Sequence, residues 1–302
     1  MRKRKTGTDA LRLRNPVLLA SGTCGYGVEL SDLADLSLLG GIVVKGISLE
    51  PREGNPPPRI VETACGLLNS IGLENPGVEY FIEHRLPLLK TLDTAIVVNI
   101  LGNSPEEYGR LAALLNLPGY IDAMEVNISC PNVKAGGIAF GALPESAAEV
   151  TRAVKKETDL PVIVKLSPNV TDITSIALAV EKAGADAVSL INTLLGMAID
   201  IDKRRPVLAN IFGGLSGPAI KPIALRMVWQ VAEVVEIPVI GIGGISTWRD
   251  AVEFFMAGAS AVQIGTATLA TPDAAIQIVN GLERFMEEQG IKGIEELHIQ
   301  RT

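Results

Sequence analysis

The sequence is poor in cysteine, positive charge and long hydrophobic runs, and each shortage excludes a class of protein. Cys24, Cys65 and Cys130 lie far apart in 302 residues, so neither a disulfide framework nor a CxxC metal site fits. No apolar run reaches 18 residues and no hydrophobic signal region follows the basic residues 2–5, so we expect a cytoplasmic protein without a membrane span. The 27 basic and 34 acidic residues give a net charge of −7, which argues against a nucleic-acid partner.

What the sequence has in abundance is small and apolar residues. Hydrophobic residues make up 47% of the chain and aromatic residues only 4%, with 30 glycines and 18 prolines. This composition is typical of β-branched strands separated by tight turns. Eight such runs occur, at residues 15–22, 41–46, 95–101, 123–129, 161–166, 187–192, 238–243 and 261–265. Their near-continuous hydrophobicity predicts parallel strands that are buried on both faces.

Segments of helical periodicity lie between the later runs. One covers residues 173–180 and ends before Gly184, and another begins at Thr247 with Asp250 as the second member of a capping box. Strands alternating with helices predict a (β/α)8 TIM barrel, as a single domain over residues 1–302. An open doubly wound sheet is the alternative, but the first strand-to-helix turn lacks a GxGxxG phosphate motif.

Two connections are too long to be simple turns. They cover residues 47–80 and 193–222, and both follow the end of a predicted strand. Loops of this length in a compact domain usually cover or line a functional site. We therefore expect both to contribute to the active site.

Polar or glycine residues end nearly every predicted strand. A buried lysine or asparagine is costly without a partner, and the active site of a TIM barrel lies at the carboxyl ends of its strands. A bound polar ligand therefore explains these residues better than chance pairing inside the core. They are Ser21, Lys45, Asn99, Asn127, Lys165, Asn192, Gly243, Gly244, Gly265 and Thr266.

The chemistry of these strand ends predicts a phosphate site and a planar ligand. Glycine-rich stretches at residues 213–219, 241–245 and 265–266 let backbone N–H groups approach phosphate oxygens. Lys45 and Lys165 leave two interpretations, a Schiff-base nucleophile as in barrel lyases or a cation beside an anionic ring or carboxylate. The asparagines favour the second, because amides pair with both donor and acceptor edges of a heterocycle.

A free cysteine, Cys130, lies one step beyond the fourth predicted strand. A free cysteine is more often a small buried side chain than a reactive one. Here it lies between Asn127 and Asn132, beside Pro131, in a loop at the active face. We therefore interpret its thiol as an acid–base group.

Together, six motifs resemble those of dihydroorotate dehydrogenases. They are NISCPN at residues 127–132, LNSIGLENPG at 68–77, VKLSP at 164–168, INT at 191–193, LSGPA at 215–219 and IGGI at 242–245. Cys130 in the position of the base resembles the soluble class 1, whereas class 2 has serine there and an additional N-terminal segment. The stretch NTLLGMAID at residues 192–200 resembles the catalytic subunit of the NAD-linked type 1B rather than the fumarate-linked type 1A.

The resemblance implies FMN-dependent oxidation of (S)-dihydroorotate to orotate in pyrimidine biosynthesis. Cys130 would remove the C5 proton while hydride passes from C6 to the flavin N5. The substrate would be held by Lys45, Asn69, Ser70, Ile71, Gly72, Leu73, Asn127, Asn132, Asn192 and Thr193. FMN would be held by Ser21, Lys45, Gly46, Asn99, Asn127, Lys165 and Ile191, with Gly217, Gly243, Gly244, Gly265 and Thr266 at its phosphate.

The resemblance also implies a partner. In type 1B enzymes, electrons pass from a homodimer of the catalytic subunit to an iron–sulfur flavoprotein subunit, which carries FAD and a 2Fe–2S cluster and reduces NAD+ within a heterotetramer. This sequence has no Rossmann motif and too few cysteines for a cluster, and we expect no metal on it. The alternatives are a fumarate-linked type 1A enzyme, a Schiff-base lyase that uses Lys165, and a flavin-binding scaffold without catalysis.

Overall fold

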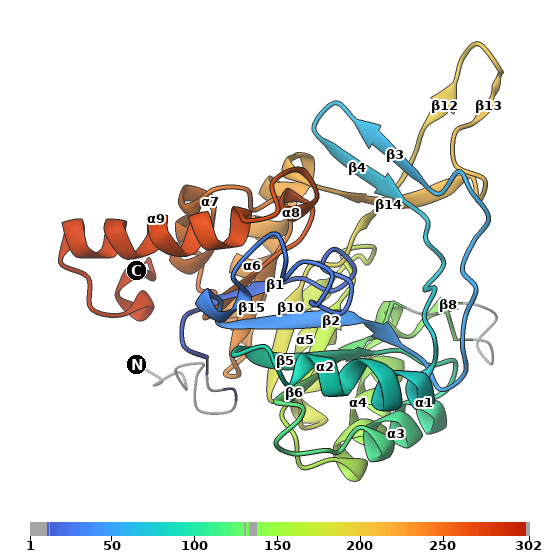
Figure 1. Cartoon of the computed structure of the whole chain (residues 1–302), viewed down its shortest axis with the longest axis horizontal. Coiled ribbons are helices and arrows are strands. Elements are labelled where there is room, and N and C mark those ends of the chain that lie inside the picture. Colours follow the sequence, from blue (N-terminus) through green and yellow to red (C-terminus); the bar gives the residue numbers. More distant parts are fainter. Residues whose placement is uncertain (1–10, 12, 130, 133–137, 300–302) are drawn as a thin grey trace.

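The computed structural model of this chain describes residues 11, 13–129, 131–132 and 138–299. Within these residues, eight parallel strands close into a barrel (Figure 1). Their order around the barrel is β1 (Val17–Leu19), β16 (Ala261–Ile264), β15 (Val239–Ile242), β10 (Ala187–Leu190), β9 (Val162–Leu166), β6 (Ala123–Asn127), β5 (Ala95–Ile100) and β2 (Gly41–Ile47). Because β1 pairs with both β2 and β16, the barrel is closed and the doubly wound alternative is wrong. The predicted TIM barrel is confirmed, and each predicted run overlaps one barrel strand.

Apolar side chains fill the amino end of the barrel, and a polar layer lies above them. A buried cluster takes one residue from each strand: Leu18, Val43, Val97, Ala123, Ile163, Ala187, Ile240 and Ala261. Two positions further along, six of the strands carry polar residues: Lys45, Asn99, Glu125, Lys165, Ser189 and Gln263. Alternate residues of a strand share a face, so these polar side chains also point into the barrel. The polar layer forms the floor of the carboxyl end, where the sites of such barrels lie.

Helices cover the outside of the barrel (Figure 1). They are α3 (Pro105–Leu114), α4 (Pro144–Glu157), α5 (Ile173–Lys182), α6 (Lys221–Val234), α7 (Trp248–Met256) and α9 (Ala274–Gln289). Shorter segments are η1 (Leu36–Leu38), α1 (Val78–Tyr80), the π-helix η2 (Phe81–Arg85), α2 (Leu86–Leu89), η3 (Phe140–Ala142), η4 (Pro218–Ile220), α8 (Ala267–Ala270) and η5 (Ile294–Leu297). The predicted helix over residues 173–180 is confirmed, and so is the capping box between Thr247 and Asp250 at the start of α7.

The two long connections contain strands that the sequence analysis did not predict. Four of them, β3 (Ile60–Thr63), β4 (Gly66–Asn69), β11 (Leu194–Met197) and β14 (Phe212–Ser216), form an antiparallel sheet in the order β11-β14-β4-β3. A hairpin of β12 (Ile199–Asp200) and β13 (Arg205–Pro206) projects from this sheet (Figure 1). A short pair, β7 (Pro131–Asn132) and β8 (Ile138–Ala139), follows β6. The two connections thus form a second sheet, in which β4 of the first pairs with β14 of the second.

No helix in the described ranges is long and apolar enough to cross a membrane.

Candidate active site

The carboxyl ends of the barrel strands bring most of the predicted site residues to one end of the molecule. Ser21 follows β1, Lys45 and Gly46 lie in β2, Asn99 in β5, Asn127 at the end of β6 and Lys165 in β9; Ile191, Asn192 and Thr193 follow β10, Gly243 and Gly244 follow β15, and Gly265 and Thr266 follow β16. Asn69 at the end of β4 and Gly217 after β14 come from the antiparallel sheet. The sheet therefore contributes to the same end of the barrel.

A buried carboxylate, Glu125, lies in the polar layer, and the sequence analysis did not predict it. Glu125 is 0% exposed and accepts hydrogen bonds from Asn99 Nδ2 at 2.8 Å, Gln263 Nε2 at 2.8 Å and Ser189 Oγ at 2.9 Å. The ammonium of Lys165 lies 3.4 Å from Glu125 Oε1 in a buried ion pair. The signal that could have revealed Glu125 is a charged residue inside a run of otherwise apolar strand residues.

The second lysine, Lys45, is in a different position. It is partly buried in β2, and its ammonium has no hydrogen bond or ion pair with any residue that the structure describes. A partly buried cation without a counterion favours an anionic ligand group beside it. Lys45 thus provides a positive charge at the site, whereas the charge of Lys165 is paired.

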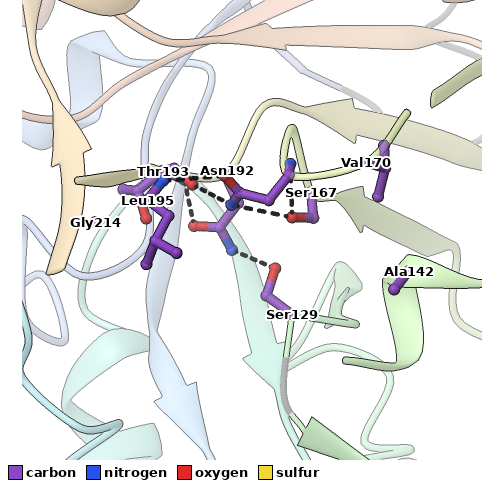
Figure 2. A pocket seen from close by; sticks show the side chains of 9 residues that line it. Ser129, Ala142, Ser167, Val170, Asn192, Thr193, Leu195 and Gly214 are labelled. Carbon is purple, nitrogen blue, oxygen red and sulfur yellow. Dashed lines mark hydrogen bonds between the residues drawn. The ribbon is translucent and has the colours of Figure 1, made fainter. Parts of the chain in front are cut away.

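A cavity of about 250 Å³ opens beside the ends of β9 and β10 (Figure 2). Its lining residues are Ser129, Ala142, Ser167, Asn169, Val170, Asn192, Thr193, Leu195 and Gly214. Asn192 Nδ2 donates to Ser129 Oγ at 2.9 Å and lies 3.3 Å from Asn127 Oδ1. Of the predicted substrate residues, Asn192 and Thr193 therefore line the cavity, and Asn127 contacts one of its walls.

One wall of the cavity is held by Asn169, which the sequence analysis also missed. Asn169 Nδ2 donates to the carbonyl of Thr193 at 2.9 Å, and Asn169 Oδ1 accepts from the backbone N–H of Leu195 at 3.0 Å. Asn69 Nδ2, in β4, donates to the carbonyl of Gly214 in the neighbouring β14 at 3.3 Å, and Gly214 also lines the cavity. Ser167 and Asn169 directly follow a predicted strand, and this position is the signal that could have revealed them.

The turn after β4 is not part of this cavity wall. Ser70, Ile71, Gly72 and Leu73 are absent from the described residues that line the cavity. Ser70 and Ile71 bind instead to Asn55, whose side chain donates to the carbonyl of Ser70 at 3.0 Å and whose N–H donates to the carbonyl of Ile71 at 2.9 Å. Their contact with substrate remains a prediction.

The predicted base, Cys130, lies outside the described residues. Its neighbour Ser129 lines the cavity, and Asn132 lies in β7, which pairs with β8. The role of Cys130 therefore remains a prediction.

The predicted phosphate residues lie close to one another. The backbone φ angles of Gly243 and Gly244 are +126° and +74°, which favour glycine, and a Cβ on Gly244 would lie 2.9 Å from the carbonyl oxygen of Gly217. A Cβ on Gly217 would in turn lie 3.5 Å from the Thr266 methyl group. The Thr266 hydroxyl donates to Ser216 Oγ at 2.8 Å. The glycines after β14 and β15 and Thr266 after β16 thus lie close together, an arrangement in which backbone N–H groups can approach an oxyanion.

A charged cluster supports these glycines from the outside. The ammonium of Lys221, at the start of α6, lies 2.7 Å from Asp250 Oδ1 and 2.9 Å from Glu253 Oε1. Partial burial lowers the pKa of Lys221, but the hydrogen bonds to these two carboxylates outweigh it and raise the pKa above its ordinary value. The cluster joins α6 to α7, the helices that follow the two glycine-rich turns.

The remaining cysteines and histidines have structural surroundings. Burial raises the pKa of the Cys24 thiol to about 12, and Cys65 is exposed between β3 and β4. The ring of His84 stacks on Tyr80, and His298 Nε2 lies 3.3 Å from the carbonyl of Ala259. No group of three or more histidine, cysteine, aspartate or glutamate residues in the described part of the chain could hold a metal ion.

Comparison with known proteins identifies the family. The family model described as dihydroorotate dehydrogenase matches residues 5–286. The chain belongs to the dihydroorotate dehydrogenase family. Within this family it is 62% identical over 287 residues to "dihydroorotate dehydrogenase B (NAD(+)), catalytic subunit" of Desulforamulus reducens, which covers 95% of this chain and 94% of that protein.

Other members of the dihydroorotate dehydrogenase family carry the same name. The protein of Geobacter sulfurreducens is 58% identical and that of Bacteroides thetaiotaomicron 55% identical, each over 287 residues; both alignments cover 95% of this chain, and 94% and 95% of those proteins respectively. A crystal structure of DHODH from Eimeria tenella in complex with ferulenol has a TM-score of 0.76 at 22% identity, covering 94% of this chain and 84% of that one. At this identity the likeness supports the barrel fold.

Proposed function

We propose that this chain oxidises (S)-dihydroorotate to orotate in pyrimidine biosynthesis, as the catalytic subunit of an NAD-linked, type 1B dihydroorotate dehydrogenase. The observation that carries the proposal is the cavity of amides and hydroxyls beside β9 and β10, with a lysine at the same end of the barrel that has no ion-pair partner among the described residues. The names of the relatives at 55–62% identity, which include NAD(+), support the NAD-linked type.

The polar groups of the cavity suit a small planar substrate with a carboxylate. Asn127 and Asn192 offer donors and acceptors that match the edges of a pyrimidine ring, and Asn69 and Asn132 belong to the same proposed set. Thr193 and the turn formed by Ser70, Ile71, Gly72 and Leu73 complete this set. Lys45 lies in β2 and would offset the substrate carboxylate, since no described residue neutralises its charge.

We propose FMN as the cofactor, and the described residues fit it. Gln263 is buried, yet its Oε1 has no hydrogen-bond partner among the residues described, so an acceptor remains for a ligand or a water. The bare turns at Gly217, Gly243 and Gly244, with Gly265 and Thr266, fit the phosphate. Ser21, Lys45, Gly46, Asn99, Asn127, Lys165 and Ile191 would surround the ring and the ribityl chain.

The residues of this chain would divide the reaction between them. FMN held by these residues would supply a hydride acceptor for substrate C6. Cys130 would take the C5 proton on its Sγ, and Asn127 and Asn192 would hold the ring so that this proton faces the thiolate. Lys165, kept close by Glu125, would stabilise negative charge that develops beside it.

The electron acceptor requires a partner. The name "catalytic subunit" of the relatives implies a second subunit, and we propose an iron–sulfur flavoprotein with FAD and a 2Fe–2S cluster. The three cysteines of this sequence fall short of the four thiolates of such a cluster. We propose a heterotetramer with a homodimer of this chain at its core, located in the cytoplasm.

An anaerobic titration of the purified chain tests the function. We expect dihydroorotate to bleach the bound flavin, with no rapid recovery when fumarate or NAD+ is added in separate cuvettes, and recovery with NAD+ once the partner subunit is present. Rapid recovery with fumarate alone would assign the chain to type 1A. A flavin that dihydroorotate does not bleach would overturn the substrate assignment and leave a flavin-binding scaffold.

The Schiff-base lyase is disfavoured by the geometry of Lys165. An ammonium that is ion-paired to a buried carboxylate has no lone pair with which to attack a carbonyl. Borohydride added with substrate should therefore leave the chain active, and irreversible inactivation would favour the lyase.

A further inference from the structure

Glu125 lies where four other barrel strands converge. Its carboxylate contacts Asn99 from β5, Lys165 from β9, Ser189 from β10 and Gln263 from β16. None of these residues is more than 5% exposed, so water takes little part in the network. The position one layer below, Ala123, belongs to the apolar cluster that fills the barrel.

A carboxylate at this point is costly, because a buried charge loses its hydration and hydrophobic residues could fill the same space. The layer below Glu125 shows that apolar residues do fill this barrel. A buried ion pair in such surroundings is weak evidence that it stabilises the fold, so stability does not explain why Glu125 lies here. The orientation that Glu125 imposes on its hydrogen-bond partners is another effect.

All four contacts of Glu125 are donors, and this fixes the direction of two amides. A carboxylate can only accept hydrogen bonds, so Asn99 and Gln263 must each turn their NH2 group toward it and their oxygen away. The oxygen of Gln263 has no partner among the described residues. The oxygen of Asn99 lies 2.8 Å from the point that a Cβ on Gly46 would occupy, so it faces a residue of the proposed FMN site.

We propose that Glu125 is a positioning residue for the flavin site. It holds the Lys165 ammonium in place and turns the amide oxygens of Asn99 and Gln263 toward the cofactor, without touching the cofactor itself. This inference rests on the proposed function, because it requires that this end of the barrel binds a flavin. In this proposal Glu125, which lies in the polar layer inside the barrel, affects both the affinity for FMN and the midpoint potential of the bound FMN.

Flavin affinity provides the first test. Apoprotein of wild type, Glu125→Gln and Glu125→Asp is titrated with FMN, and fluorescence quenching gives Kd well below the unfolding temperature of each variant. We expect Glu125→Gln to raise Kd about tenfold or more, since its amide cannot accept from all four donors. Glu125→Asp keeps the negative charge but shortens the side chain by one methylene, so we expect a smaller rise in Kd. If Glu125→Gln does not fold, the Kd of Glu125→Asp tests the proposal.

A matched control separates positioning from general destabilisation. Val150→Ala truncates a fully buried side chain of α4, outside the barrel. We expect it to lower the unfolding temperature while leaving the FMN Kd within about twofold of wild type. An equal rise of Kd in Val150→Ala and Glu125→Gln would overturn the proposal, because the effect would then follow stability alone.

The midpoint potential of bound FMN provides the second test. If Glu125 positions Lys165, its loss leaves the buried ammonium without the carboxylate that holds it in place, so the ammonium moves away and the reduced flavin loses a nearby cation. We expect Glu125→Gln to lower the affinity for reduced relative to oxidised flavin about tenfold, a fall of about 30 mV for a two-electron couple. A rise in potential would mean that Glu125 merely offsets the charge of Lys165, and it would overturn the positioning role.

The two proposals fail in different ways. A wild-type apoprotein that binds no FMN would overturn the proposed cofactor and with it this inference. Wild-type binding of FMN together with unchanged Kd and potential in both Glu125 variants would overturn the inference alone.

Discussion

At the scale of single residues, two lysines that sequence patterns treat alike have different environments. Both Lys45 and Lys165 interrupt an apolar strand near its carboxyl end. Lys165 is ion-paired to Glu125, whereas Lys45 has no counterion in the described part of the molecule. The sequence could show that two cations reach the site, but the counterion of each depends on which strands are neighbours in the closed barrel. Their different roles therefore required the structure.

Glu125, the counterion of Lys165, also could not be recognised from the sequence alone. Strand periodicity predicts where a run is buried, and the Glu125 run was correctly predicted as a strand. The donors that make a buried carboxylate tolerable lie between 26 and 138 residues away along the chain. Such partners become visible only when the order of strands in the barrel is known.

The role of Cys130 leads to a residue-scale prediction. We expect Cys130→Ala to retain FMN but to slow flavin reduction by dihydroorotate about 10²-fold or more, the usual contribution of a positioned base. Stopped-flow absorbance at the flavin band measures this rate. Cys65→Ser is the matched control, since that thiol is exposed between β3 and β4, and it should reduce at the wild-type rate. Wild-type reduction in Cys130→Ala would remove this thiol from the mechanism.

At the scale of elements, the long connections were predicted as site loops but not as strands. Their strands are short and rich in glycine, and β14 reads Phe-Gly-Gly-Leu-Ser. Glycine weakens the sequence signal for a strand, and β14 pairs with β4, about 145 residues away. Strands of this kind are stabilised by tertiary pairing rather than by local pattern, so their existence does not follow from composition or periodicity.

Asn169 joins two of these elements and leads to an element-scale prediction. Its amide bridges Thr193 and Leu195, so it holds the segment between β10 and β11 against the loop after β9. We expect Asn169→Ala to raise the KM for dihydroorotate by up to about 30-fold, from the loss of two hydrogen bonds of about 1 kcal/mol each, while FMN content stays unchanged. Steady-state kinetics with the partner subunit measures KM and kcat separately.

Asn116 provides the matched control for Asn169. It follows α3, and its side chain accepts from the Thr158 hydroxyl at 3.0 Å in a helix-to-strand loop, the type of loop that lies at the amino end of such barrels. Asn116→Ala should leave KM unchanged. An equal rise of KM in both variants would contradict a local role for Asn169.

Asp250 leads to a prediction about pH. Partial burial raises the pKa of Asp250, but hydrogen bonds from Lys221, Ser246 and Thr247 outweigh it and hold the pKa below its ordinary 3.8. A carboxyl group whose pKa is lowered on folding stabilises the protein above its ordinary pKa, and this contribution is lost as the pH falls through the folded value. Asp250→Ala should therefore lower the free energy of unfolding by about 1–2 kcal/mol at pH 7.

The same variant should lose its effect in acid. As the pH falls below 3.8 the difference between wild type and Asp250→Ala should shrink, because Asp250 is protonated first in the unfolded chain and, at lower pH, in the folded wild type. Urea unfolding at pH 7 and pH 3 measures both differences. Asp32→Ala, at an exposed carboxylate, should change stability little at either pH. A difference for Asp250→Ala that is equal at both pH values would show that the carboxylate charge does not contribute.

At the scale of the whole molecule, the barrel could be predicted because each buried strand is a separate apolar run. Closure then places the ends of all eight strands at one rim, and this brought residues as distant as Ser21 and Thr266 to the same end of the chain's fold. The sequence predicted only some residues of the polar layer inside the barrel, because Ser189 and Gln263 lie within apolar runs rather than at their ends. The structure thus shows that the strand ends and the layer beneath them form one polar region.

That region leads to a prediction about removal of the cofactor. Without a ligand, Lys45 has no counterion and Gln263 Oε1 has no hydrogen-bond partner among the described residues. A bound ligand could provide both interactions. A ligand that binds only the folded chain, at about 100 times its Kd, adds about 2.7 kcal/mol to stability. For a domain of this size we expect FMN to raise the Tm of the apoprotein by roughly 5–10 °C in differential scanning fluorimetry.

Riboflavin at the same concentration separates the two parts of the site. It carries the ring and the ribityl chain but not the phosphate, so it can satisfy the polar layer while leaving the turns at Gly217, Gly243 and Gly244 without an anion. We expect it to raise the Tm less than FMN does. Equal shifts would contradict the phosphate site, and no shift with either compound would contradict a flavin at this end of the barrel. In the proposed site the ring and the phosphate contact different groups of strands, so the difference between the two shifts would measure how much the turns after β14, β15 and β16 contribute.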